Sequence, residues 1–248
     1  MNWLTRKEAL GHEIIKLLYK ERLILTWYRD NPNGWKLVSG MWSPFYIQLR
    51  ELIAFPNILK KVGLYLSEVI KNEIHGVDVV IGLAMAGIPI ATAISIEGNI
   101  PSAFTRKIDG DFNNFDELIQ RYGKHSLIEG RLNDGHNVVL VDDLVSYFTS
   151  KVNGIELVEY EIKRRNLKNL KLQNILVLLD REQGGVEEAK KRNIDLHSLI
   201  PFKSKGIHWL KEDLNSIEYK IITNYLDDPA KYQNIDLQTE LTKQSSLK

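Results

Sequence analysis

The sequence predicts an α/β fold in which a mostly parallel, twisted sheet is flanked by helices. Two observations support this fold class. Short continuous apolar runs, typical of strands covered on both faces, recur along the middle of the chain. Segments whose apolar residues follow helical spacing separate these runs. Glycine, proline and asparagine mark several of the boundaries, as expected of turns.

The N-terminal part predicts a helix followed by a small hood of strands. Thr5 and Glu8 have the spacing of a capping box, and apolar residues at helical spacing follow, so we expect a helix over residues 6–20. After a turn cluster, two strands are expected at residues 35–38 and 45–52. These elements make up a first region, residues 1–55.

The regular alternation of strands and helices lies in a core that we place at residues 56–204. Strands are expected at residues 77–82, 101–107, 137–142 and 174–180, and helices at residues 57–71, 86–98 and 150–166. Residues 109–131 are polar and lack a periodic apolar pattern, which is typical of a functional lid or a disordered connection. A C-terminal helical segment and tail, residues 205–248, completes the chain.

Composition and charge exclude several classes of function. With 44% hydrophobic and 26% charged residues, the 248-residue chain has the composition of a soluble globular protein. A formal net charge of +1 does not favour nucleic acid or a membrane surface as a partner. The chain has no cysteine, so disulfides and thiolate metal sites are excluded. The start does not resemble an export signal and glycine and proline interrupt the most apolar run, so we expect a cytoplasmic protein.

Four polar or glycine-rich segments follow the predicted strands. In open sheets of this kind, ligands bind beyond the carboxyl ends of the strands. The segments in question are residues 82–87, 106–107, 142–143 and 180–181. We therefore expect them to converge at one edge of the sheet and to form the binding site.

Two interpretations fit the adjacent acids Asp142 and Asp143. One acid caps the next helix while the other lies in a turn. Alternatively, the two carboxylates accept hydrogen bonds from two ribose hydroxyls, directly or through Mg²⁺. The hydroxyls of Ser146, Thr149 and Ser150, together with backbone amides that open the next helix, would then hold a phosphate. A sugar phosphate fits both halves of the segment.

The run VVLVDDLVSYFTSK, residues 138–151, resembles the phosphoribosyl-pyrophosphate signature of type I phosphoribosyltransferases. That signature is an apolar strand, two acids, two apolar residues and a phosphate loop. Further segments are similar to orotate phosphoribosyltransferases in particular. They are residues 37–50, 81–95, 104–130 and 179–185, which occur in the order found in that family. The resemblance covers about residues 35–190.

The resemblance implies a reaction and its partners. The reaction would join orotate to phosphoribosyl pyrophosphate, with Mg²⁺, and yield orotidine 5′-monophosphate and pyrophosphate. Because the mobile loop of one subunit completes the other active site in this family, the resemblance also implies a homodimer. The chemistry needs carboxylates near the ribose, where positive charge develops, and cations near the departing pyrophosphate.

The resemblance also assigns roles to individual residues. Asp142 and Asp143 would take the ribose hydroxyls and the associated Mg²⁺, and they form the catalytic set with Lys107. Arg106 and Lys107 would neutralise pyrophosphate, and Arg181 would pair with the orotate carboxylate. The remaining substrate-binding assignments are Phe45 and Tyr46 at the base, Ala86 and Gly87 through backbone amides, and Ser146, Thr149, Ser150 and Lys124 at the phosphates.

The chain departs from the family pattern in three places. Phe148 and Thr149 stand where glycine is usual in the phosphate turn, and the bulk of Phe148 disfavours positive φ. Gln120 stands where the loop lysine is expected, with Lys124 as a neighbouring cation, and Val38 replaces another lysine. These departures leave an alternative open, a catalytically impaired phosphoribosyltransferase-like protein that binds nucleotides or regulates a partner.

Overall fold

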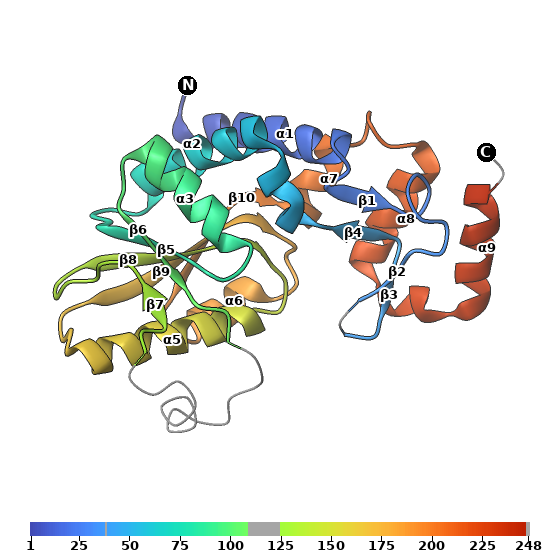
Figure 1. The fold of residues 1–248 in the computed structure, drawn as a ribbon. Coiled ribbons are helices and arrows are strands. Elements are labelled where there is room, and N and C mark those ends of the chain that lie inside the picture. Colours follow the sequence, from blue (N-terminus) through green and yellow to red (C-terminus); the bar gives the residue numbers. More distant parts are fainter. Residues whose placement is uncertain (38, 109–124, 247–248) are drawn as a thin grey trace. The chain divides into compact units, whose positions relative to one another are not determined.

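The structure is a computed structural model that describes residues 1–37, 39–108 and 125–246. The chain divides into two compact units, one formed by residues 56–199 and the other by residues 1–55 together with 200–248. Residues 205–248, which the sequence sets apart as a segment of their own, therefore share a unit with the N-terminal region. Figure 1 shows the elements of both units.

The larger unit is built on a six-stranded sheet with the order β10-β9-β8-β5-β6-β7. Its strands are β5 (Val79–Gly82), β6 (Ser102–Thr105), β7 (Ile128–Glu129), β8 (Asn137–Val145), β9 (Lys171–Asp180) and β10 (Asp195–Pro201). β5 runs parallel to β6 and β8, and β8 runs parallel to β9. β7 pairs antiparallel with β6. The predicted α/β fold with a mostly parallel sheet is confirmed.

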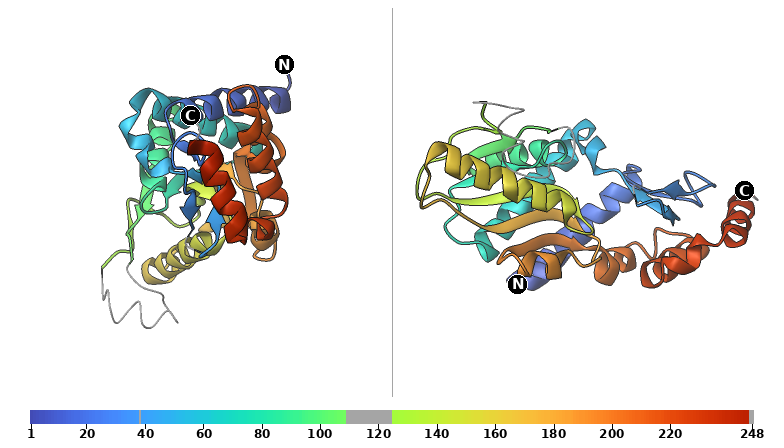
Figure 2. Two further views of the ribbon diagram at one scale, coloured as in Figure 1. Left: turned by 90° about the vertical axis from the view of Figure 1, so that its right-hand side faces the viewer. Right: turned by 90° about the horizontal axis from the view of Figure 1, so that it is seen from below.

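Helices cover both faces of this sheet, with α2 and α3 on one side and α5 and α6 on the other (Figure 1). Their bounds are α2 (Pro56–Glu73), α3 (Gly87–Gly98), α5 (Thr149–Arg165) and α6 (Gly185–Lys190). The right-hand view of Figure 2 shows α5 in front of the strands. Because both faces are covered, Val139, Leu140 and Val141 of β8 are all fully buried, which explains why the strand is continuously apolar.

The smaller unit combines short strands with helices. Its elements are α1 (Trp3–Lys20), β1 (Ile24–Thr26), β2 (Trp35–Lys36), β3 (Trp42–Ser43), β4 (Phe45–Ile47), η1 (Leu49–Ala54), η2 (Phe202–Gly206), α7 (Ile207–Trp209), α8 (Ser216–Asp227), η3 (Ala230–Gln233) and α9 (Ile235–Ser246). β1 pairs with β4, and β2 pairs with β3, both antiparallel. Buried aromatic rings hold this unit together, with Phe45 packed against Phe202 and Tyr225.

Two predicted boundaries in this unit were wrong. Helix α1 begins at Trp3, because the side chain of Asn2 accepts a hydrogen bond from the Thr5 amide at 2.9 Å and caps the helix. The strand expected over residues 45–52 ends at Ile47. Leu49 and Leu52 are both buried, and their spacing of three residues suits the 3₁₀-helix η1.

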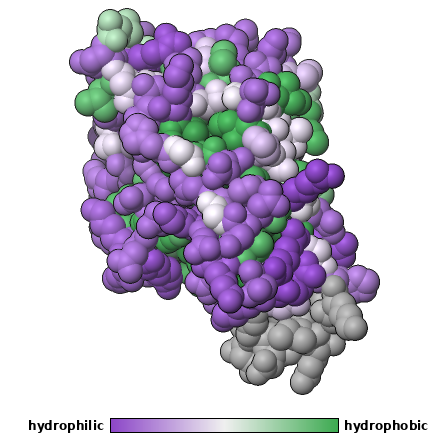
Figure 3. Space-filling model, turned by 90° about the vertical axis from the view of Figure 1, so that its left-hand side faces the viewer, coloured by the Kyte–Doolittle hydropathy of each residue, from purple (hydrophilic) through white to green (hydrophobic). Residues whose placement is uncertain are grey.

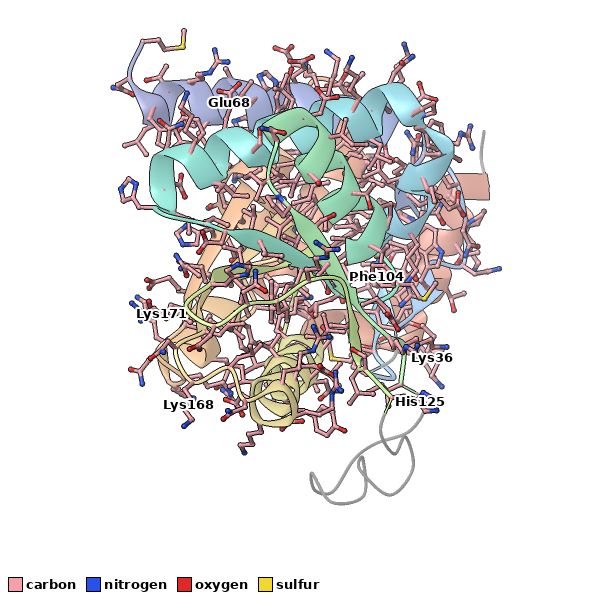
Figure 4. The ribbon with its side chains drawn as sticks, turned by 60° about the vertical axis from the view of Figure 1, so that its left-hand side comes forward. Lys36, Glu68, Phe104, His125, Lys168 and Lys171 are labelled. Carbon is pink, nitrogen blue, oxygen red and sulfur yellow. The ribbon has the colours of Figure 1, made fainter. Side chains whose placement is uncertain are left out.

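The face of the protein drawn in Figure 3 is mainly polar. Within the described ranges, no helix combines the length and the apolar character needed to cross a membrane. Figure 3 shows one face, on which hydrophilic residues predominate and hydrophobic residues form smaller areas. Among the exposed apolar side chains of the larger unit are Leu64, Ile96 and Phe104, the last of which is labelled on β6 in Figure 4.

Candidate active site

The predicted convergence of strand ends is confirmed by the sheet register. Gly82, the last residue of β5, is level with Phe104 on one neighbour and with Val141 on the other. Val145, the last residue of β8, is level with Asp180, the last residue of β9. The segments that follow these four parallel strands therefore leave the sheet at the same edge.

The acid pair lies inside β8 and not at its end. The strand continues to Val145 because Leu144 and Val145 still pair with β9. Neither acid is the N-cap of the next helix, because that position is Phe148, which makes no side-chain cap bond. The interpretation of the pair as helix-capping residues is therefore wrong.

Asp142 is held by bonds within the protein. One carboxylate oxygen, Oδ2, accepts a hydrogen bond from Nζ of Lys151 at 2.7 Å, and Oδ1 accepts one from the Asp143 amide at 2.9 Å. The Asp142 residue is 8% exposed and Lys151 only 2%. Sequence reasoning missed Lys151. The available signal was a lysine in the first turn of a helix, where a cation opposes the helix dipole.

Asp143 is more available to a ligand. Its Oδ1 accepts a hydrogen bond from the Leu144 amide at 2.8 Å, whereas Oδ2 has no hydrogen-bond partner among the residues that the structure describes. Burial, and then the negative charge of Asp142, raise the pKa of Asp143 to about 7, and the charge of Lys151 opposes this rise. Asp143 has a carboxyl oxygen at the edge of the sheet that accepts no hydrogen bond from a described N–H group, and the raised pKa means that the group is mainly ionised above about pH 7.

The phosphate turn, defined here as residues 146–150, has the backbone shape that glycine would give. Phe148 adopts φ 70° and ψ −6°, in the left-handed region. Its side chain is 2% exposed and belongs to the hydrophobic core that includes Val145 and Ala189. Positive φ is disfavoured for phenylalanine, as expected, but burial of the ring offsets this conformational cost here. The hydroxyl-bearing residues Thr149 and Ser150 remain exposed.

The turn between β5 and α3 presents backbone amides beside the acid pair. The Ala84 amide donates to Oγ1 of Thr105 at 2.9 Å, and the Gly87 amide donates to the Leu83 carbonyl at 2.8 Å. Those two amides are therefore engaged within the protein. Hydrogen bonds from the Met85 and Ala86 amides to other described residues are not observed, so these two amides are the candidates for an anionic ligand.

Glycine is required at position 87 because α3 begins against β8. A Cβ atom at this position would lie 2.2 Å from the Val141 carbonyl oxygen and 3.2 Å from Cα of Asp142. We expect Gly87→Ala to destabilise the protein by about 1–3 kcal/mol and to displace the acid pair. Urea denaturation measures the first effect, and Ser95→Ala on the same helix serves as a control. Unchanged stability in Gly87→Ala would contradict the close contact.

Arg106 and Lys107, predicted to neutralise pyrophosphate, follow β6 and are exposed. Arg106 donates from Nε to Oε1 of Glu129 at 2.6 Å. Because both side chains of this ion pair are substantially exposed, its net stabilisation is small, about 0–1 kcal/mol. A polyanionic ligand could therefore replace Glu129 as the ion-pair partner of Arg106 at little cost in free energy.

Arg181 immediately follows Asp180, the last residue of β9, and its amide donates to the Val145 carbonyl at 2.9 Å. Its side chain is half-buried. Asp180 is 4% exposed, and burial raises the pKa of its carboxyl group. The position of Arg181 at the shared strand edge agrees with the place expected for it, and its role toward a substrate carboxylate stays a prediction.

Comparisons with known proteins identify the family. No family model matches the chain. Orotate phosphoribosyltransferase of Methanocaldococcus jannaschii is 33% identical over 168 residues, which are 67% of this chain and 84% of that protein. The chain belongs to the orotate phosphoribosyltransferase family. It is also 34% identical over 163 residues, 66% of its length, to bovine uridine 5′-monophosphate synthase, of which these residues span 30%.

The solved structures agree with this family. The crystal structure of orotate phosphoribosyltransferase from Aeropyrum pernix is 25% identical and has a TM-score of 0.61. The match covers 80% of this chain and 97% of that one. These findings favour the family's own activity over the alternative of an impaired nucleotide-binding or regulatory protein.

The remaining predicted residues belong to the smaller unit or lie outside the described part of the chain. Phe45 and Tyr46 belong to the smaller unit, where Phe45 is 1% exposed and Tyr46 stacks on Trp35 with ring centroids 6.1 Å apart. Lys124 and the departures Gln120 and Val38 lie outside the described residues. Of the three departures from the family pattern, the one in the phosphate turn is the one that the structure describes.

The acid pair fits a metal ion only in part. Within the described ranges, no group of three or more histidine, cysteine, aspartate or glutamate side chains is placed to hold a metal. Both carboxylate oxygens of Asp142 already accept hydrogen bonds, so Asp143 is the member of the pair with an oxygen to offer. Mg²⁺ at this site would therefore need most of its ligands from substrate oxygens and water, as is usual for this ion.

Proposed function

We propose that this chain catalyses the reaction after which its family is named. The bond between ribose C1 and pyrophosphate breaks, and a bond forms between C1 and a ring nitrogen of orotate, which loses its proton. The products are orotidine 5′-monophosphate and pyrophosphate. The observation that carries the proposal is an acid pair followed directly by a hydroxyl-bearing turn at the edge of a parallel sheet, in a chain of this family.

The charges at the sheet edge suit the transition state of this reaction. Positive charge develops on the ribose when the C1 bond breaks, and the carboxylate of Asp143 would stabilise it. Negative charge develops on pyrophosphate, which Arg106 and Lys107 would neutralise together with the amides of Met85 and Ala86. Thr149 and Ser150 would hold the 5′-phosphate at the start of α5.

Three further features are part of the proposal. Mg²⁺ would bind with phosphoribosyl pyrophosphate, beside Asp143, and would neutralise charge on the leaving pyrophosphate. Arg181 would pair with the carboxylate of orotate as a planar, two-pronged donor. The family resemblance supports action as a homodimer in the cytoplasm, and analytical ultracentrifugation of the purified chain tests the dimer.

A spectrophotometric assay tests the proposed reaction. We expect the orotate absorbance to fall when the chain is mixed with orotate, phosphoribosyl pyrophosphate and Mg²⁺. We expect Asp143→Asn to lower kcat/KM by about 100-fold or more, because a charge near the developing positive charge is lost. Asp195→Asn, which changes an exposed aspartate of the same sheet, should leave the rate unchanged. Absence of turnover by the folded wild-type chain would overturn the proposal.

A further inference from the structure

The ammonium group of Lys151 lies beneath the phosphate turn and joins its two ends. Its Nζ donates to Oδ2 of Asp142 at 2.7 Å and to the Leu144 carbonyl at 2.5 Å, both before the turn. It also donates to Oγ of Ser150, in the turn itself, at 3.1 Å. A lysine has three donor hydrogens, so these three acceptors use all of them.

The surroundings make a lysine at this position costly unless it has such partners. A buried ammonium group loses its hydration, and Lys151 is only 2% exposed. It also lies in the first turn of α5, where the helix dipole disfavours positive charge. The carboxylate of Asp142 offsets both effects, which ties the position of that carboxylate to the lysine.

The bond from Lys151 sets the direction of the Ser150 hydroxyl. Because an ammonium group only donates, Oγ of Ser150 accepts this bond and keeps its own hydrogen for another acceptor. Ser150 is exposed, so its hydroxyl hydrogen is available on the outer side of the turn. A phosphate oxygen is the kind of acceptor that this arrangement favours.

The bonds of Lys151 give the two acids different roles. Asp142 uses Oδ2 for Lys151 and Oδ1 for the Asp143 amide, so both of its oxygens are engaged in the protein. Asp143 keeps one oxygen without a hydrogen bond to the described residues. The acid pair thus consists of one residue whose oxygens are both engaged in the protein and one residue with an oxygen left for a ligand.

We propose that Lys151 is a positioning residue of the sugar-phosphate site, which fixes the Asp142 carboxylate and orients the Ser150 hydroxyl toward the 5′-phosphate. The inference rests on the proposed function and adds to it a residue that does not itself touch the substrate. It assigns direct contact with the substrate to Ser150 and Asp143.

Replacement of Lys151 by methionine tests the proposal. We expect the affinity for ribose 5-phosphate, measured by calorimetry, to fall about 10- to 100-fold, as expected for lost charge-assisted hydrogen bonds. In the assay, KM for phosphoribosyl pyrophosphate should rise by a similar factor, whereas KM for orotate should change little. Lys168→Met, which removes an exposed lysine labelled in Figure 4, is the control for net charge.

A charge rescue separates positioning from simple loss of packing. The chain contains no cysteine, so Lys151→Cys introduces the only thiol. Alkylation with 2-bromoethylamine in denaturant, followed by refolding, places an ammonium group at almost the position of the lysine amine. We expect ribose 5-phosphate affinity to return to within a few-fold of the wild-type chain after the same treatment. If the modified chain folds but its affinity does not recover, the proposal is overturned. This test remains decisive even if Lys151→Met does not fold.

A double-mutant cycle tests the link to the hydroxyl. If Lys151 acts through Ser150, the loss of affinity in Ser150→Ala and Lys151→Met should not be additive in the double variant. Additive losses, or a Lys151→Met variant that melts earlier but binds ribose 5-phosphate normally, would reduce Lys151 to a structural role. If the ribose 5-phosphate affinity of the chain depends on Lys151 but the wild-type chain does not consume orotate, the proposed reaction alone is refuted.

Discussion

Replacement of Glu161 by glutamine is expected to lower the free energy of unfolding by roughly 3–5 kcal/mol, because it breaks a buried ion-pair network. The Glu161 side chain is fully buried in α5. It accepts hydrogen bonds from Nη2 of Arg164 at 2.7 Å, from Nε of Arg165 at 2.5 Å and from the Leu127 amide at 2.6 Å. A neutral amide would leave two guanidinium groups without their counter-charge.

Glu161 also joins α5 to the segment that leads into β7. Arg165, one of its partners, donates to the Ile128 carbonyl at 2.6 Å and to the Gly130 carbonyl at 3.2 Å. Urea denaturation at neutral pH measures the expected loss of stability. Glu156→Gln, which changes an exposed glutamate of the same helix, should stay within about 0.5 kcal/mol of the wild type. Equal stability of the two variants would contradict the role of the network.

The same residue gives a pH dependence. Burial alone would raise the pKa of Glu161, but hydrogen bonds from Arg164, Leu127 and Arg165 hold the pKa below its ordinary value of 4.5. A carboxyl group with a lowered pKa contributes stability above its unfolded pKa, and this contribution is lost as the pH falls through the folded pKa. We expect the stability difference between wild type and Glu161→Gln to shrink as the pH is lowered below 4.5.

Replacement of Phe148 by alanine is expected to destabilise the protein by roughly 3–5 kcal/mol, because the buried ring leaves a cavity. Replacement by glycine should cost about 1 kcal/mol less than replacement by alanine. The reason is φ 70° at this residue, a conformation that glycine adopts freely and alanine does not. The smaller side chain is thus expected to give the more stable variant, although it has one carbon fewer to bury.

Thermal and urea denaturation of the two Phe148 variants measure this order. If Phe148→Ala is as stable as Phe148→Gly, the left-handed conformation at this position carries no cost. Phe202→Ala, which removes a fully buried ring of the smaller unit, serves as a comparison for cavity formation at a position without positive φ. The affinity of Phe148→Gly for ribose 5-phosphate tests a further point. Glycine allows the same backbone conformation without the ring, so a loss of affinity would show that the ring itself supports ligand binding by the turn.

The sequence by itself determined the alternation of strands and helices in residues 77–107 and 137–180, because apolar runs and helical spacing are local properties of the chain. It also identified Asp142 and Asp143 together with the hydroxyl residues that follow them, since these lie in one continuous segment. The place of the site followed from topology, because parallel strands bring their carboxyl ends to one edge of the sheet.

Only the tertiary structure decided which charges meet. Asp142 pairs with Lys151 across a turn, Arg106 meets Glu129 across two strands, and Glu161 binds an amide 34 positions away in sequence. Such pairs depend on which side chains packing buries together. The strength of each pair depends on how much water its charges lose. Neither the pairing nor its strength can be read from the sequence, because both depend on tertiary packing. Phe148 is the same case, because the core that receives its ring holds the backbone in a conformation that phenylalanine alone would avoid.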